Sequence, residues 1–125
     1  MVGKWHVGNE PGRYPTDHGF DYWYGIGGTW DESIWPSDKW FQESGLEPHY
    51  VQESTEPRRM EKLEVLDVEV RKNIDLTFLE KGEQWMEDSV ESDEPFVLDC
   101  NHSNVPFPTL TRDDSCASAA GGPGA

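Results

Sequence analysis

The chain has 125 residues, which is enough for one domain, and its 25 acidic residues against 10 Lys and Arg give a formal net charge of −15. That charge argues against binding of nucleic acid, which requires a basic surface. No apolar stretch reaches the ~18 residues of a membrane span. The two cysteines, Cys100 and Cys116, are too few for a disulfide framework.

The apolar content is low for an independent domain. Leu, Ile, Val and Phe make up less than a fifth of the residues, which together with the high net charge approaches the composition of disordered chains. The six Trp, four Tyr and five Phe are nevertheless a heavy aromatic content, and aromatic side chains need partners to bury against. We therefore expect part of a larger fold that is only marginally stable alone.

The first half of the chain predicts one strand followed by loops. Strand-forming residues predict a short strand over residues 2–7, and residues 9–19 are rich in Pro, Gly, Asn and Asp, as loops are. The aromatic run FDYWY at 20–24 is closed by GIGG. Residues 29–57 contain frequent turn residues and no sustained period, so we expect irregular surface chain there.

The second half predicts a helix and a second strand. Apolar residues at helical spacing, with charged residues on the other face, predict an amphipathic helix over residues 68–90. The apolar stripe consists of Val70, Ile74, Phe78, Trp85 and Met86, with Leu79 beside it. Residues 95–100, PFVLDC, predict a short buried strand, and residues 101–108 predict the loop after it. The tail at 111–125 consists mostly of small residues and is expected to be disordered.

This order of elements predicts an α/β fold with short parallel strands, one long amphipathic helix and long irregular loops. We expect residues 2–7 and 96–100 to be neighbouring parallel strands, with the helix packed on one face of the sheet. Ligand-binding groups in such sheets gather at the C-terminal ends of the strands. His6 and the loop at 101–108 should therefore lie at the same edge.

Lys4 and His6 are the first candidates for a functional site. Residues i and i+2 of a strand project from the same face, ~6.5–7 Å apart. A Lys ammonium beside an imidazole forms a clamp for an oxyanion ester, because Lys supplies fixed positive charge and His supplies an N–H donor that can also protonate a leaving oxygen. Lys-x-His alone is a common coincidence, so its interpretation depends on the surrounding sequence.

Three sequence blocks supply that context. GKWHVG at 3–8 is followed by HGFDYWYG at 18–25, and PFVLDCNHSNVPFP occupies 95–108. These blocks resemble the sulfatase family (arylsulfatase-like) of the alkaline-phosphatase-like superfamily, whose members read GKWHLG, then HGFDxxxG, and later PFFLYxxHxxxHxP. The resemblance covers residues 1–110, which we interpret as a partial sulfatase domain. The family pattern is lost in the tail at 111–125, which suggests a disordered or aberrant end.

The resemblance implies hydrolysis of sulfate esters, of a small molecule or of a sulfated glycan. In the family, a cysteine in a Cys-x-Pro-x-Arg segment is oxidised to formylglycine, whose hydrate attacks sulfur, and a divalent cation, usually calcium, is held by Asp and Asn ligands. The resemblance implies that Lys4 and His6 are catalytic and substrate-binding residues that contact sulfate oxygens and the hydrated aldehyde. His102 matches an upstream His of some members and is a third candidate for substrate binding.

The chain departs from the family pattern where the nucleophile and the metal are expected. Neither Cys100 nor Cys116 lies in Cys-x-Pro-x-Arg, and the Asp and Asn residues that bind the metal are missing. Pro106 stands where the family has the His before x-Pro, and proline cannot donate to a leaving group. Because Met1 aligns with an interior residue of the family's strand, which often reads Met-x-Gly-Lys-Trp-His, we expect an internal segment that is inactive alone. The alternative is a non-catalytic acidic interaction segment derived from a sulfatase.

Four further residues near the second block are weaker candidates. His18 and Asp21 are more typical of turn packing and turn stabilisation than of ligand binding. Thr29 and Ser33 lie about where some family members place a substrate-contacting Ser.

Overall fold

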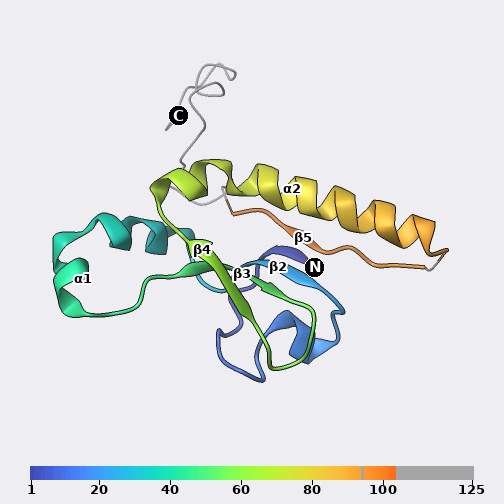
Figure 1. Ribbon diagram of the computed structural model, residues 1–125, viewed down its shortest axis with the longest axis horizontal. Helices are drawn as coiled ribbons and strands as arrows, with labels where there is room; N and C mark the ends of the chain where they lie inside the picture. The colour runs from blue at the N-terminus through green and yellow to red at the C-terminus, as the bar shows by residue number, and fades with distance from the viewer. Residues whose placement is uncertain (94, 104–125) are drawn as a thin grey trace, which may run out of the picture.

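A mixed sheet with a long helix along one face forms the centre of the described chain (Figure 1). The structure is a computed structural model that describes residues 1–93 and 95–103. The strands are β1 Val2–Lys4, β2 Trp23–Ile26, β3 Tyr50–Ser54, β4 Glu61–Val65 and β5 Cys100–Asn101. The helices are α1 Lys39–Ser44 and α2 Val68–Glu91, with two 3-10 helices, η1 Pro15–His18 and η2 Trp30–Ser37. The predicted tail at 111–125 lies outside the described residues.

The strands follow the order β4-β3-β2-β1-β5, so β1 lies between two partners. β1 pairs parallel with β2 on one side and with β5 on the other, whereas the pairs β2–β3 and β3–β4 are antiparallel. The predicted α/β class and the predicted pairing of the first and last strands are therefore confirmed. The two strands are shorter than expected, because β1 ends at Lys4 and β5 contains only Cys100 and Asn101.

The prediction of irregular chain over residues 29–57 is wrong in part. This range contains α1 and the whole of β3, and β4 follows directly as the second strand of a hairpin. The reason lies in two polar residues, Gln52 and Ser54, which are 2% and 3% exposed. Because β3 buries polar side chains on one face, it lacks the alternation of apolar and polar residues by which a half-buried strand is recognised.

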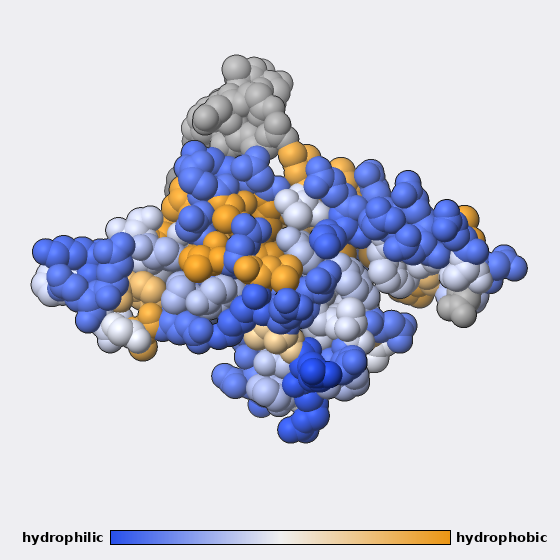
Figure 2. Space-filling view, viewed as in Figure 1, coloured by the Kyte–Doolittle hydropathy of each residue, from blue (hydrophilic) through white to orange (hydrophobic). Residues whose placement is uncertain are grey.

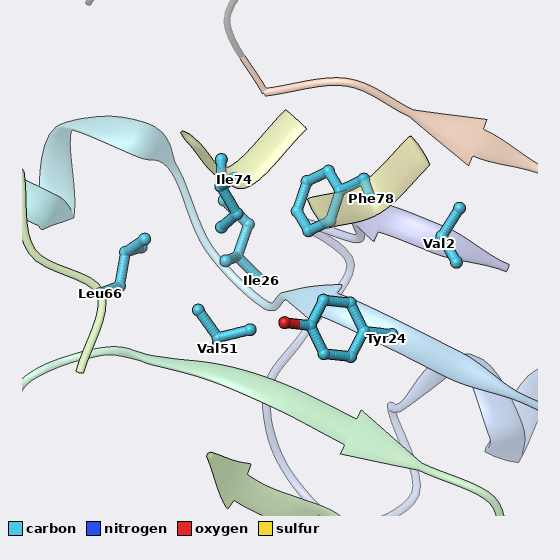
Figure 3. Packing of buried hydrophobic residues seen from close by; sticks show 7 residues of the cluster. All are labelled: Val2, Tyr24, Ile26, Val51, Leu66, Ile74 and Phe78. Atoms are coloured by element: carbon cyan, nitrogen blue, oxygen red, sulfur yellow. The ribbon is translucent and has the colours of Figure 1, made fainter. Parts of the chain in front are cut away.

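The sheet contributes residues to two apolar clusters. On the α2 side, the larger cluster is formed by Val2, Tyr24, Ile26, Val51, Leu66, Ile74 and Phe78 (Figure 3). Within it, the rings of Tyr24 and Phe78 meet edge to face with centroids 6.2 Å apart, a favourable arrangement for two aromatic side chains. A smaller cluster contains Met1, Tyr14 and Trp23. The aromatic run at 20–24 thus supplies neighbouring strand residues to both clusters, as the period of a strand dictates.

Helix α2 extends over Val68–Glu91, close to the predicted range of 68–90. Asp67 caps its start, since the carboxylate accepts a 2.8 Å hydrogen bond from the backbone N–H of Val70. The buried positions are Arg71, Ile74, Phe78 and Gly82. Arg71 was expected on the charged face, but it is 1% exposed because it lies one turn before Ile74 on the stripe that faces the sheet.

The visible surface is mostly hydrophilic, as the charge of the chain leads one to expect (Figure 2). Apolar residues gather over β4 in this view. Among the described residues, none of the helices combines the length and the apolar character needed to cross a bilayer.

Two glycines provide a matched test of how the sheet is packed. Gly3 has φ +105°, and a Cβ atom there would lie 2.0 Å from the backbone oxygen of Asn101 in β5. Gly82 of α2 has room for a methyl group, because the three nearest atoms to its Cβ position are 3.5–3.7 Å away. We predict that Gly3→Ala lowers the free energy of unfolding by at least ~2 kcal/mol, whereas Gly82→Ala raises it by ~0.5–1 kcal/mol.

Urea unfolding followed by far-ultraviolet circular dichroism measures both changes. Shifts of the unfolding midpoint in opposite directions are expected. A Gly3→Ala midpoint equal to that of the unaltered chain would contradict the close approach of β1 and β5.

Candidate functional site

The chain turns sharply where β1 ends. The backbone N–H of Trp5 still donates to the carbonyl of Ile26 in β2, at 3.0 Å, but His6 has φ +56° and is exposed. The expectation that Lys4 and His6 project from one face of a continuous strand is therefore wrong in its geometry. A left-handed conformation at a residue other than Gly, Asn or Asp is uncommon, and it redirects His6 away from the strand direction.

Trp5 joins the first two sequence blocks. Its ring lies 5.5 Å from that of His18 and meets the ring of Phe20 edge to face at 6.4 Å. Its indole N–H donates to the carbonyl of Arg13 at 2.6 Å. These contacts give His18 a packing role in the turn, in line with the interpretation from the sequence.

The turn before the second block is held by a residue that the sequence did not single out. The carboxylate of Asp17 accepts hydrogen bonds from the backbone N–H groups of Gly12, Tyr14 and Arg58, at 2.7–3.0 Å. Asp21, the residue expected to stabilise this region, is exposed. Asp17 therefore fastens the loop that supports Trp5.

Lys4, His6 and His102 come together around one open hollow of the surface. The hollow is lined by Lys4, Trp5, His6, Cys100, Asn101 and His102. Since β1 and β5 are parallel neighbours with Gly3 opposite Asn101, the residues that follow them emerge at the same edge of the sheet. The expected proximity of His6 to the start of the loop after β5 is thus observed. Residues 104–108 of that loop, with Pro106, lie outside the described residues.

A carboxylate near Lys4 was not predicted. Asp31, in the first turn of η2, has a lowered pKa, for which the side-chain hydrogen bond from Thr29 is the largest cause and the charges of Lys4 and Arg71 are further causes. These interactions favour the ionised form of the Asp31 carboxylate. The sequence did contain a signal for Asp31: it lies shortly after the glycines that follow β2. Residues that follow neighbouring parallel strands meet at one edge of the sheet, so Asp31 could have been expected near Lys4.

Thr29 and Ser33 differ in their access to ligands. Thr29 is half-buried and bonded to Asp31. Ser33 is completely buried, so its hydroxyl group is not accessible to a ligand from solvent.

The side chains of the hollow do not fit a calcium ion. Calcium takes six to eight oxygen ligands, largely from carboxylates and carbonyls, whereas the side chains here offer an ammonium, two imidazoles, a thiol, an indole and one amide. Over residues 1–93 and 95–103, His, Cys, Asp and Glu side chains do not gather in threes that could hold a metal ion. Cys100 is an exposed free thiol, and Cys116 lies outside the described residues.

The sequence is similar to mammalian sulfatases over short stretches. It is 42% identical over 41 residues to the N-acetylgalactosamine-6-sulfatase of Rattus norvegicus, a match that spans 30% of this chain and 8% of that protein. It is 56% identical over 25 residues to the N-acetylgalactosamine-6-sulfatase of Homo sapiens, which is 20% of this chain and 5% of that protein. No protein-family model matches the chain.

The fold is similar to that of a solved sulfatase. The crystal structure of the PsFucS1 sulfatase from Pseudoalteromonas sp. superposes with a TM-score of 0.79 at 20% sequence identity, over 98% of this chain and 26% of that one. The described chain thus corresponds to about a quarter of the solved protein and has its fold there. The chain is thus similar to sulfatases in its local identities and in its fold, and it spans only a small part of the relatives that it matches.

Proposed function

We propose that this chain contributes part of the sulfate-ester site of a sulfatase, with Lys4, His6 and His102 as contacts to the sulfate group. The supporting observation is that these three side chains line one hollow at the C-terminal ends of β1 and β5. Within the proposal, Lys4 and His6 are also the catalytic residues of this part of the site.

The side chains of the hollow suit an oxyanion. The Lys4 ammonium carries fixed positive charge and three donors, and each imidazole offers an N–H donor, while sulfate oxygens are acceptors only. An imidazole can also deliver a proton to the leaving oxygen of an ester near neutral pH. The hollow is open, so a sulfate group attached to a larger molecule can reach it from solvent.

The names of the relatives support one class of substrate. Two of the curated relatives are named for the 6-sulfate ester of N-acetylgalactosamine, a sulfated sugar. We therefore propose a sulfated glycan, or a small sulfated sugar, as the molecule whose sulfate group meets Lys4 and His6.

The same proposal holds that the chain is inactive alone. Cys-x-Pro-x-Arg does not occur in the sequence, so the segment that supplies formylglycine in the family has no counterpart in it. A well-placed donor to a developing charge contributes ~2.7–4 kcal/mol, which is far below the ~8–23 kcal/mol by which enzymes lower reaction barriers. Lys4 and His6 can therefore stabilise charge but cannot replace a nucleophile.

A specific observation favours the alternative of an acidic interaction segment. A groove along the end of α2 has Met86, Val90 and Phe96 as its apolar lining, and its rim is acidic. The rim consists of Glu83, Glu87 and Glu91. A cationic amphipathic peptide fits such a groove, because its apolar face would meet the lining and its positive charges the rim. Tighter binding of that peptide at the groove than of sulfate at the hollow would favour this alternative.

A first prediction concerns binding of inorganic sulfate to the whole chain. We expect saturable chemical-shift changes at Lys4, His6 and His102, with Kd near ~1 mM because the net charge of −15 opposes anion binding. Lys4→Ala should raise Kd by about tenfold or more, since it removes a charged donor. Lys39→Ala is the matched control, because this lysine side chain on α1 is 83% exposed and lies outside the hollow.

Nuclear magnetic resonance titration with sodium sulfate, against sodium chloride at equal ionic strength, measures these changes. Equal loss of binding in the Lys4→Ala and Lys39→Ala variants would contradict a site at the hollow, since it would show a response to total charge only.

A second prediction concerns activity. The purified chain should hydrolyse an aryl sulfate no faster than buffer does, with or without added calcium, because the nucleophile segment is missing from the sequence. The release of the phenol measures the rate. Turnover that disappears in Lys4→Ala or His6→Ala would contradict the prediction and would mean that these residues belong to a more complete catalytic site.

A further inference from the structure

A carboxylate of α2 fastens the loop that carries His102. The Oδ1 atom of Asp75 accepts a 2.7 Å hydrogen bond from the backbone N–H of Ser103 and a 3.0 Å hydrogen bond from its hydroxyl group. Ser103 is fully buried, so both donors are shielded from water. Asp75 thus holds the chain just after β5 against the helix, across 28 residues of sequence.

The same oxygen also faces His102. The Nδ1 atom of His102 lies 3.9 Å from Asp75 Oδ1, and the His102 side chain is 54% exposed at the hollow. Because the two ring nitrogens lie on different sides of the imidazole, a ring whose Nδ1 faces Asp75 directs Nε2 away from α2. The carboxylate therefore fixes the residue directly after His102, while its 3.9 Å distance to the ring is too long for a hydrogen bond.

Asp75 also acts electrostatically on a buried arginine of the same helix. Arg71, one helical turn earlier, is 1% exposed; burial lowers the pKa of its guanidinium, while the negative charges of Asp75 and Asp31 act in the opposite direction. Asp31 in turn lies near Lys4. Lys4 and Arg71 thus act electrostatically on Asp31, and Asp31 and Asp75 act on the buried Arg71.

We propose that Asp75 is a positioning residue for anion binding: by bonding Ser103, it keeps His102 opposite Lys4 and His6 across the hollow. The proposal deepens the function proposed above and rests on it. The effect of Asp75 on position and the effect of its charge change sulfate affinity in opposite directions. The negative charge of Asp75 opposes a bound anion, so removal of that charge alone should strengthen sulfate binding. Any weakening must therefore come from loss of position.

Two substitutions separate position from charge. Asp75→Ala removes both the charge and the acceptor, and we expect Kd for inorganic sulfate to rise by about tenfold despite the lost repulsion. Asp75→Asn removes the charge but keeps an oxygen that can accept both hydrogen bonds from Ser103, so Kd should be equal to that of the unaltered chain or lower. Glu80→Ala, which removes one exposed negative charge elsewhere on α2, is the matched control and should lower Kd slightly or leave it unchanged.

Sulfate titrations of the full chain, followed by the resonances of His6 and His102, measure these constants. Tighter sulfate binding in Asp75→Ala than in the unaltered chain would overturn the proposal, because Asp75 would then act only as a nearby charge. Weaker binding in Asp75→Asn, to the same extent as in Asp75→Ala, would overturn it as well.

Hydrogen exchange distinguishes failure of this inference from failure of the proposed function. The Ser103 amide should exchange about tenfold faster in Asp75→Ala and stay protected in Asp75→Asn. The Val2 amide, which donates to the carbonyl of Asp99 at 2.9 Å, reports on the sheet and should be unchanged. If sulfate does not bind the unaltered chain, the proposed site is refuted; anchoring by Asp75 is then refuted only if Ser103 exchange is the same in all variants.

Discussion

The arrangement of the site depends on the close approach of backbones at the centre of the sheet. A Cβ atom on Gly3 would lie 2.0 Å from the oxygen of Asn101, and one on Gly25 would lie 1.9 Å from the oxygen of Gly3. Because neither position carries a side chain, β1 lies tightly between β2 and β5. Gly3 is paired with Asn101, so Lys4 and His102, the residues that directly follow this pair, emerge together at the hollow.

The charges near the hollow run against the charge of the chain as a whole. The net charge is −15, yet the hollow is lined by one lysine and two histidines. The carboxylates nearby are engaged: Asp31 is bonded to Thr29 and lies near Lys4 and Arg71, and Asp75 accepts two hydrogen bonds from Ser103. Carboxylates that hold backbone and hydroxyl groups in place can thus support an anion site that their charge alone would weaken.

The sequence predicted the elements whose signals are local. The helical period predicted α2 almost to the residue, and the structure adds the cap at Asp67. The hairpin of β3 and β4 was missed because Gln52 and Ser54 are buried polar residues, and Arg71 was assigned to the wrong face because a charged residue on an apolar stripe is read as exposed. In each case the packing of distant segments outweighs the preference of the residue itself.

By itself the sequence predicted the α/β class and the long helix, its GKWH and HGFD blocks showed a resemblance to sulfatases, and it offered Lys4, His6 and His102 as candidate residues. Only the tertiary structure decided that β1 ends at Lys4, that His6 turns out of the strand, and that Asp31 and Asp75 lie near the hollow. The physical reason is the sequence separation of the residues that interact. Period, capping and motif spacing are properties of neighbouring residues, whereas the contact of Asp75 with Ser103 joins residues 28 positions apart and exists only once α2 and β5 have packed on β1.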